Sequence, residues 1–105
     1  MTPPEEIPGE QIADADLILR TRLVPGDAVV VVGPGPIGLL AAMVARAVGA
    51  RDVAIVGTPG DVALRFAKAR ELGFNNLINI GETDAVKAVM DLTHGIGADV
   101  IVECS

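Results

Sequence analysis

Residues 28–38 read AVVVVGPGPIG, and this stretch decides the fold. Ala28–Val32 is a continuous run of small and β-branched apolar residues without alternation, which is typical of a strand covered on both faces of a parallel sheet. A glycine-proline turn follows at once. Pro36 suits the first position of a helix, which we expect to end at Gly49. The stretch therefore predicts a strand, a tight turn and a helix in succession.

The same alternation continues along the chain. Asp61 is predicted to cap a helix that ends near Leu72, and Thr83 or Asp84 to cap the next one. The remaining strands are predicted at residues 52–56, 76–80 and 99–103. Strands that alternate with helices of about a dozen residues indicate right-handed βαβ units and a parallel sheet. The fold class is therefore α/β.

Composition and charge exclude several classes of function. The 105 residues carry a net charge of −6, so a nucleic-acid footprint is not expected. One cysteine and one histidine cannot form a disulfide framework or a zinc site within the chain. Residues 28–45 are uncharged over a length that would span a membrane, but two glycines and two prolines interrupt them. We expect no membrane contact, no signal peptide at residues 1–9, and a cytoplasmic location.

The turn after the first strand has the pattern G-x-G-x-x-G, in the context of a strand and a helix that gives this motif its meaning. Gly33 allows the tight turn, Gly35 leaves room for a pyrophosphate, and Gly38 lets the helix pack closely on the strand. Backbone N–H groups near Pro36 and Ile37, helped by the helix dipole, would bind phosphate oxygens. The motif predicts a dinucleotide site; a glycine turn that serves packing alone is the alternative.

The end of the second strand bears on the choice between NAD and NADP. An acidic residue commonly accepts the ribose 2′-OH there in NAD sites, but this strand ends at Gly57 and Thr58. Thr58 would donate a hydrogen bond, and Arg65 or Lys68 would supply positive charge to a 2′-phosphate. The sequence therefore favours NADP, with the alternative that Arg65 and Lys68 form a solvated helix face.

Three further polar residues give weaker signals. His94 stands at a helix end, where an imidazole commonly meets the last carbonyls. Cys104 follows the fourth strand, at the carboxyl edge where open α/β sheets bind ligands, and is interpreted as a small half-buried residue beside the cofactor. Glu103 is either a strand-end contact or a solvent-facing charge.

From about Val24 onward the sequence resembles the cofactor domain of zinc-type medium-chain dehydrogenases, especially the sorbitol and threonine dehydrogenase branch. The resemblance rests on Pro25-Gly26-Asp27, on VVVVGPGPIGLLAAMVARAVGA ending at Ala50, and on ARELG at residues 69–73. It continues with LTHG at residues 92–95 and GADVIVEC at residues 97–104.

This resemblance implies a partial Rossmann fold, a parallel sheet of about four strands in the order 3-2-1-4 with helices on both faces. Composition predicts a lead over residues 1–9, and apolar spacing predicts a helix from Glu10 to Leu23. By the resemblance, residues 1–23 are a shortened linker and residues 24–105 are a dinucleotide-binding half-domain. The resemblance implies that the glycine turn binds the pyrophosphate, that Gly57 and Thr58 face the adenosine ribose, and that Cys104–Ser105 approach the other end of the cofactor.

The resemblance also implies a reaction, hydride transfer between a secondary alcohol and NAD(P) with a catalytic zinc that polarises the alcohol oxygen. The family's zinc ligands lie in a catalytic domain that this sequence does not contain. We therefore expect an NAD(P)-binding fragment of an alcohol or polyol dehydrogenase, inactive alone. The alternatives are a stand-alone nucleotide-binding or regulatory module and a non-functional remnant.

Self-association is a further expectation. In the family's full sheet the fourth strand, Asp99–Glu103, is covered by strands that this sequence lacks. An edge strand rich in valine and isoleucine invites pairing with another chain. The sequence therefore predicts a dimer through the open sheet edge or the bare faces beside it, with Val102 at the seam.

Overall fold

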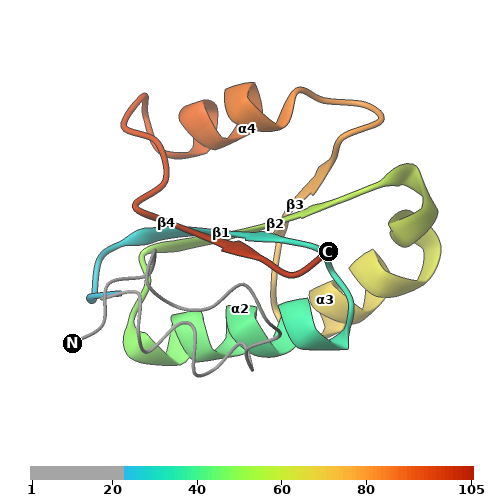
Figure 1. Cartoon of the computed structure of the whole chain (residues 1–105), viewed down its shortest axis with the longest axis horizontal. Helices are drawn as coiled ribbons and strands as arrows, with labels where there is room; N and C mark the ends of the chain where they lie inside the picture. The colour runs from blue at the N-terminus through green and yellow to red at the C-terminus, as the bar shows by residue number, and fades with distance from the viewer. Residues whose placement is uncertain (1–22) are drawn as a thin grey trace.

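The computed structural model describes residues 23–105, which form four parallel strands and the helices between them (Figure 1). The strands are β1 (Ala28–Val32), β2 (Asp52–Gly57), β3 (Asn76–Asn79) and β4 (Val100–Glu103). Their order across the sheet is β3-β2-β1-β4, and each neighbouring pair is parallel. The predicted partial Rossmann fold and its strand order are thus confirmed. The third and fourth strands are each one residue shorter than expected.

The strand register brings the carboxyl ends of all four strands to one edge of the sheet. Val32 of β1 is paired with Val56 on one side and with Glu103 on the other. Gly57 at the end of β2 is paired with Asn79 at the end of β3. The segments that leave these strands therefore begin side by side, and this arrangement positions the candidate site.

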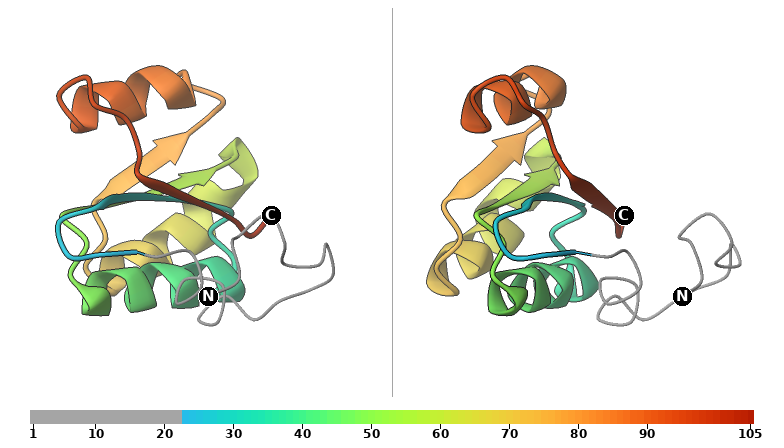
Figure 2. Two further views of the ribbon diagram at one scale, coloured as in Figure 1. Left: turned by 60° about the vertical axis from the view of Figure 1, so that its left-hand side comes forward. Right: turned by 90° about the vertical axis from the view of Figure 1, so that its left-hand side faces the viewer.

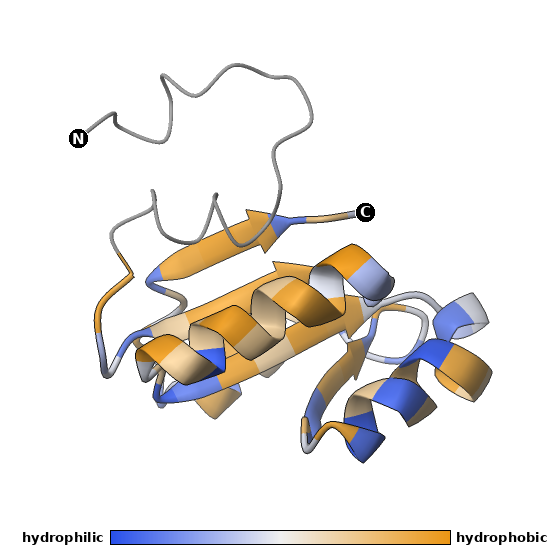
Figure 3. Ribbon diagram, turned by 90° about the horizontal axis from the view of Figure 1, so that it is seen from below, coloured by the Kyte–Doolittle hydropathy of each residue, from blue (hydrophilic) through white to orange (hydrophobic). Residues whose placement is uncertain are grey.

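One face of the sheet is covered by α2 (Pro36–Val48) and α3 (Ala67–Glu71), as the views from the side and from below show (Figures 2 and 3). Helix α2 begins and ends as predicted. Gly49 closes it in the left-handed region at φ 107°, where its N–H bonds to the carbonyl oxygens of Ala45 and Arg46. Three alanines of α2, Ala41, Ala42 and Ala45, are buried because their small side chains let the helix lie close to Val29 and Val31 of β1.

The connection from β2 to α3 differs from the expected single helix. It begins with a 3-10 turn, η2 (Pro59–Asp61), and a π-helical turn, η3 (Val62–Phe66), which leads directly into α3. The side chain of Asp61 does not cap the following helix but reaches back to Thr58. The wider π turn accompanies the burial of Phe66, whose ring packs against Gly57 so closely that a Cβ there would stand 2.8 Å from it.

Among residues 23–105, the opposite face of the sheet is covered by one helix, α4 (Ala85–Leu92) (Figure 1). Asp84 caps this helix through a carboxylate oxygen that accepts from the N–H groups of Val86 and Lys87 at 2.9 and 3.3 Å, as the sequence predicts for one of its two candidates. The helix packs over Val30, Ala54, Val56 and Ile78. This second core is smaller than the first, and Ile101 of β4 beside it is 66% exposed.

Within residues 23–105, no helix combines the length and the apolar character needed to cross a membrane. The predicted lead and its helix from Glu10 to Leu23 lie outside the described residues, except for Leu23 itself. Leu23 packs against the core on the α2 face.

Candidate functional site

The candidate site is a cleft of about 470 Å3 at the carboxyl edge of the sheet. The cleft opens where the chain leaves β1 for the α2 face, while β4 arrives beside β1 from the α4 face. Such a switch point is where open α/β sheets bind their ligands. The residues that line the cleft are Val32, Gly33, Pro34, Gly35, Val56, Gly57, Thr58, Asp61, Arg65, Ile80, Cys104 and Ser105.

Two of the three motif glycines are used for close packing. Gly33 has φ 110°, and its N–H donates to the carbonyl oxygen of Val56 at 2.8 Å. A Cβ on Gly33 would stand 2.8 Å from the backbone of Cys104. A Cβ on Gly38 would stand 1.7 Å from the carbonyl oxygen of Gly33. Neither position has room for a side chain, as the motif predicts for the turn and for the contact between helix and strand.

Gly35 is different, because its free space faces the cleft. The atom nearest to a Cβ there would be Nη1 of Arg65 at 3.7 Å, an ordinary van der Waals distance. Gly35 also precedes the first turn of α2, which contains no acidic residue, and no described side chain caps the helix. The helix therefore directs its positive dipole end at the turn without a built-in counter-charge.

The remaining motif residues lie beside the cleft rather than on its lining. Pro36 occupies the first position of α2, and Ile37 is 54% exposed on the helix surface. Gly38 is buried against the turn. These residues shape the helix N-terminus, while the lining is made by the segment before them.

The second wall of the cleft is the turn after β2. Asp61 Oδ2 accepts from the backbone N–H of Thr58 at 2.8 Å and from its hydroxyl at 3.0 Å. These bonds lower the pKa of Asp61 below its usual value, the backbone N–H having the larger effect. Arg65 lies within 3.5 Å of the other carboxylate oxygen. The Thr58 hydroxyl, which the sequence assigned to a 2′-phosphate, is thus already donated to Asp61.

The third wall is the segment after β4. The N–H of Cys104 donates to the carbonyl oxygen of Val32 at 2.7 Å, which continues the pairing of β4 with β1 past the strand end. Cys104 is half-buried, as expected. Glu103 accepts from the backbone N–H of Ser105 at 2.9 Å and from its hydroxyl. Glu103 is thus a strand-end contact that holds this wall.

The structure brings Gly33, Gly35, Gly57, Thr58, Arg65 and Cys104 together on the cleft, out of the nine residues that the sequence analysis selects. Lys68 is not on the lining and pairs with Glu71 at 3.4 Å on the outside of α3. His94 has φ 56° in the turn after α4 and is not on the lining either.

Asp61 is a site residue that the sequence did not predict, because its position before a helical stretch indicates a helix cap. The signal was present in the T-x-x-D spacing from Thr58, which is typical of a turn that folds back on its first residue. Ile80 was also missed; its N–H donates to the carbonyl oxygen of Gly57 at 3.0 Å, which brings it to the cleft lining.

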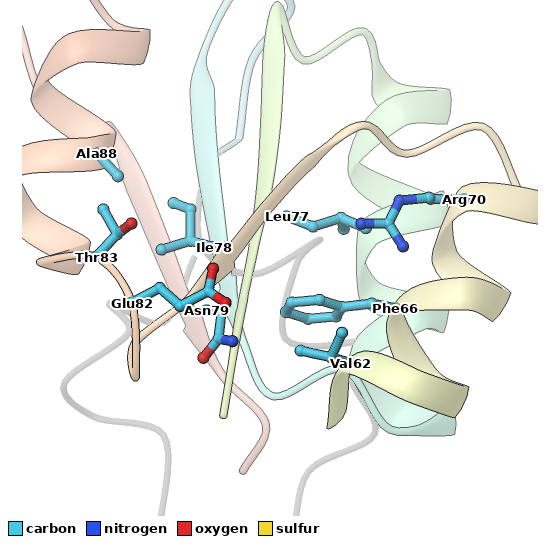
Figure 4. A pocket seen from close by; sticks show the side chains of 9 residues that line it. All are labelled: Val62, Phe66, Arg70, Leu77, Ile78, Asn79, Glu82, Thr83 and Ala88. Atoms are coloured by element: carbon cyan, nitrogen blue, oxygen red, sulfur yellow. The ribbon is translucent and has the colours of Figure 1, made fainter. Parts of the chain in front are cut away.

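A second cavity, of about 220 Å3, lies along the edge strand β3 (Figure 4). Its lining includes Phe66 and Leu77 from the α3 face and Ile78 and Thr83 from the α4 face. It is distant in sequence from the glycine turn and does not lie at the switch point. The cleft beside Gly35 is therefore the candidate site.

The donor set of the chain does not fit a zinc ion. The sequence holds one histidine and one cysteine. Among residues 23–105, no three histidine, cysteine, aspartate or glutamate side chains gather as a metal site would require. The glycine turn, the bare helix N-terminus and the Arg65 guanidinium do fit a dinucleotide.

Comparisons with known proteins agree with the fold and with the resemblance seen in the sequence. The family model described as zinc-binding dehydrogenase matches residues 36–105. A sorbitol dehydrogenase of Halalkalibacterium halodurans is 49% identical over 88 residues, which are 84% of this chain and 25% of that protein. An L-threonine 3-dehydrogenase of Pyrococcus horikoshii is 45% identical over 82 residues, 78% of this chain and 23% of the relative.

Solved structures give the same result. The alcohol dehydrogenase TADH of Thermus sp. ATN1 superposes with a TM-score of 0.76 at 30% identity, covering 90% of this chain and 27% of the other. The 2R,3R-butanediol dehydrogenase of Bacillus subtilis has a TM-score of 0.73 at 36% identity, covering 89% and 26%. The chain thus spans about a quarter of the length of these relatives. On the match over residues 36–105, the chain belongs to the zinc-binding dehydrogenase family.

Proposed function

We propose that the cleft binds NAD or NADP and that the chain is the cofactor-binding part of an alcohol or polyol oxidoreductase. The observation that carries this proposal is the open backbone at Gly35. Gly33 and Gly38 pack so closely against neighbouring backbone that no side chain fits there. Gly35 instead faces the cleft and precedes the N-terminus of α2, whose first turn contains no acidic residue. A pyrophosphate needs this combination of close approach and positive dipole.

The walls of the cleft suggest the direction in which the cofactor lies. The turn at Thr58 is on the adenosine side, because the acceptor for the adenosine ribose lies at the end of the second strand in this fold. The segment Cys104–Ser105 is on the nicotinamide side, across the glycine turn. When bound, the nicotinamide ring supplies the hydride chemistry, and the residues of this chain bind and orient the cofactor.

The substrate side is proposed from the relatives alone. Sorbitol and L-threonine 3-dehydrogenases are among them, so a secondary alcohol such as a polyol is the substrate class that we propose for the activity as a whole. Because the chain's donor set does not fit zinc, we propose that it does not oxidise an alcohol alone. The cytoplasmic location expected from the sequence stays a prediction.

A titration of the purified chain with NADH and NADPH, followed by nicotinamide fluorescence, tests this function. Binding in the high micromolar range, about −5 to −6 kcal/mol, is expected because the cleft surrounds only part of a dinucleotide. AMP should bind more weakly than NADH. If AMP binds as tightly, the stand-alone nucleotide module is favoured, and if no nucleotide binds, the remnant is.

We also propose that the chain self-associates through the α4 face and the edge strand β4. Beside β4 lies an apolar cleft of about 420 Å3, whose lining includes Val30, Val86, Met90 and Ile101. Val86 and Ile101 are 72% and 66% exposed. Since β4 pairs only with β1 among the described strands, its outer backbone groups are available to a second copy.

A further inference from the structure

The carboxylate of Asp61 folds back from η2 to the end of β2. Its Oδ2 accepts hydrogen bonds from the backbone N–H and the hydroxyl of Thr58, at 2.8 and 3.0 Å. A Cβ on Gly57 would stand 3.0 Å from the same oxygen. The carboxylate therefore lies beside the last residue of β2, although Asp61 itself belongs to the next turn.

This place has a known meaning in dinucleotide sites. An acidic side chain near the end of the second strand accepts a hydrogen bond from the ribose 2′-OH of NAD. The sequence offers no acid directly at the end of β2, but the fold delivers one there from the following turn. Asp61 also lines the cleft, and its side chain is 13% exposed.

The second oxygen of Asp61 keeps acceptor capacity. An ionised carboxylate has about four lone-pair sites. Oδ2 accepts two hydrogen bonds from Thr58, whereas the one polar contact of Oδ1 within the described part of the chain is with the guanidinium of Arg65, at 3.5 Å. That distance is long for a hydrogen bond. A ribose hydroxyl that enters the cleft can therefore donate to Oδ1.

Arg65 extends from the Asp61 side toward the glycine turn. Its side chain is 55% exposed, and Nη1 would be 3.7 Å from a Cβ on Gly35. One positive charge is thus shared between the Asp61 carboxylate and the place that we propose for the pyrophosphate. This leaves little positive charge for an additional phosphate at the ribose.

We propose that Asp61 determines cofactor specificity in this chain, by accepting a ribose hydroxyl of NAD and repelling the 2′-phosphate of NADP. The proposal rests on dinucleotide binding in the cleft, as proposed above. It departs from the NADP preference that the sequence analysis inferred from the missing acid at the strand end. The reason is electrostatic: a 2′-phosphate would lie against the Asp61 carboxylate, and the cation paired with that carboxylate, Arg65, is already shared with the glycine turn.

The test compares NADH and NADPH on the full chain by nicotinamide fluorescence, in the parent, in Asp61→Asn and in Glu71→Gln. Glu71→Gln is the matched control, since it removes the same charge from an exposed position outside the cleft. The parent should bind NADH at least about tenfold more tightly than NADPH. Asp61→Asn should lower that ratio by about tenfold, and Glu71→Gln should leave it unchanged.

The outcomes separate this inference from the proposed function. Binding of both cofactors with the same ratio in the parent and in Asp61→Asn overturns the role of Asp61 and leaves cofactor binding intact. Binding of neither cofactor by the parent refutes the proposed function, and this inference with it.

A second measurement needs no variant and covers the case in which Asp61→Asn does not fold. The parent is titrated by calorimetry with ADP-ribose and with its 2′-phosphorylated form. The unphosphorylated compound should bind at least about tenfold more tightly. Equal affinities, or tighter binding of the phosphorylated form, would overturn the proposal.

Discussion

Gly38 lies against the carbonyl group of Gly33, so closely that a β-carbon at position 38 would stand 1.7 Å from the carbonyl oxygen. This contact joins the first turn of α2 to the end of β1. It sets the position of the helix N-terminus relative to the cleft, because the intervening residues form only one tight turn. Packing at Gly38 and binding at Gly35 are therefore separate roles within one motif.

Gly38→Ala should destabilise the fold strongly. The added methyl group meets a backbone oxygen, which cannot move away as a flexible side chain can, so the cost should lie near the upper end of overpacking, about 3 kcal/mol. Chemical denaturation followed by circular dichroism measures it. Gly35→Ala is the control, since its Cβ would have no neighbour nearer than 3.7 Å, and it should change stability by less than about 1 kcal/mol. Equal losses in the two variants would contradict the assigned roles.

Gly35→Val should keep the fold and lose cofactor binding. The branched side chain would occupy the space where the pyrophosphate must approach the backbone. NADH affinity, measured by fluorescence, should fall by at least about tenfold, equivalent to about 1.4 kcal/mol. Ala47→Val puts the same branched side chain on the exposed side of α2, away from the cleft lining, and it should bind NADH as the parent does. If Gly35→Val binds equally well, the site is wrongly placed.

Asp61 should stabilise the chain in a way that depends on pH. Its folded-state pKa is lowered, chiefly by the N–H of Thr58 and then by its hydroxyl. A lowered pKa gives stability that is complete above the unfolded-state value, about 4, and is lost as the pH falls through the folded-state value. The melting temperature of the parent should therefore exceed that of Asp61→Asn near neutral pH, and the difference should shrink in strong acid. Thr58→Val removes the hydroxyl donor and should lower the melting temperature near neutral pH by part of the amount that Asp61→Asn does. A gap between the parent and Asp61→Asn that widens in acid would contradict the stabilising role of the Asp61 carboxylate.

Much of the fold was predictable because its signals are local. The unbroken valine run of β1, Pro36 at the helix start and Gly49 at its end are each sufficient for the element that they mark, and α2 has the predicted bounds. The strand order followed from the resemblance to a known family. The register could not be predicted as directly, because it depends on how the strands pair in space.

The sequence predicted those parts of the site that depend on the absence of a side chain near the backbone. It predicted less well the parts that depend on the direction in which a side chain points. Gly33, Gly35 and Cys104 meet in the cleft because they follow adjacent parallel strands. Asp61 was misassigned because a sequence does not show whether a carboxylate caps forward or folds back. Val102 was placed at the open seam, but it is completely buried in the α2-face core, and Ile101 is the exposed residue of β4.

Added zinc should not create alcohol oxidation by this chain. The substrate oxygen needs a metal held by three protein ligands with one open position, and one cysteine and one histidine do not supply them. The measurement is NAD(P) reduction with sorbitol or threonine, with and without zinc, against a blank without protein. Zinc-dependent reduction of NAD(P) above the blank would refute the proposal that this chain binds the cofactor but does not oxidise an alcohol alone.

Ile101→Lys should weaken self-association without unfolding the chain. Ile101 is 66% exposed beside the apolar cleft under α4, so a lysine there keeps its charge in water in the monomer but must bury it in a contact between two copies. Stability should change by less than about 0.5 kcal/mol, as is usual for an exposed position.

Val102→Ala is the contrasting variant, because Val102 faces the core on the α2 side. This variant should lose about 2 kcal/mol of stability, and the association of the folded chain should be unchanged. Sedimentation over a concentration series measures both, and a parent that remains monomeric at high concentration would refute the proposed interface.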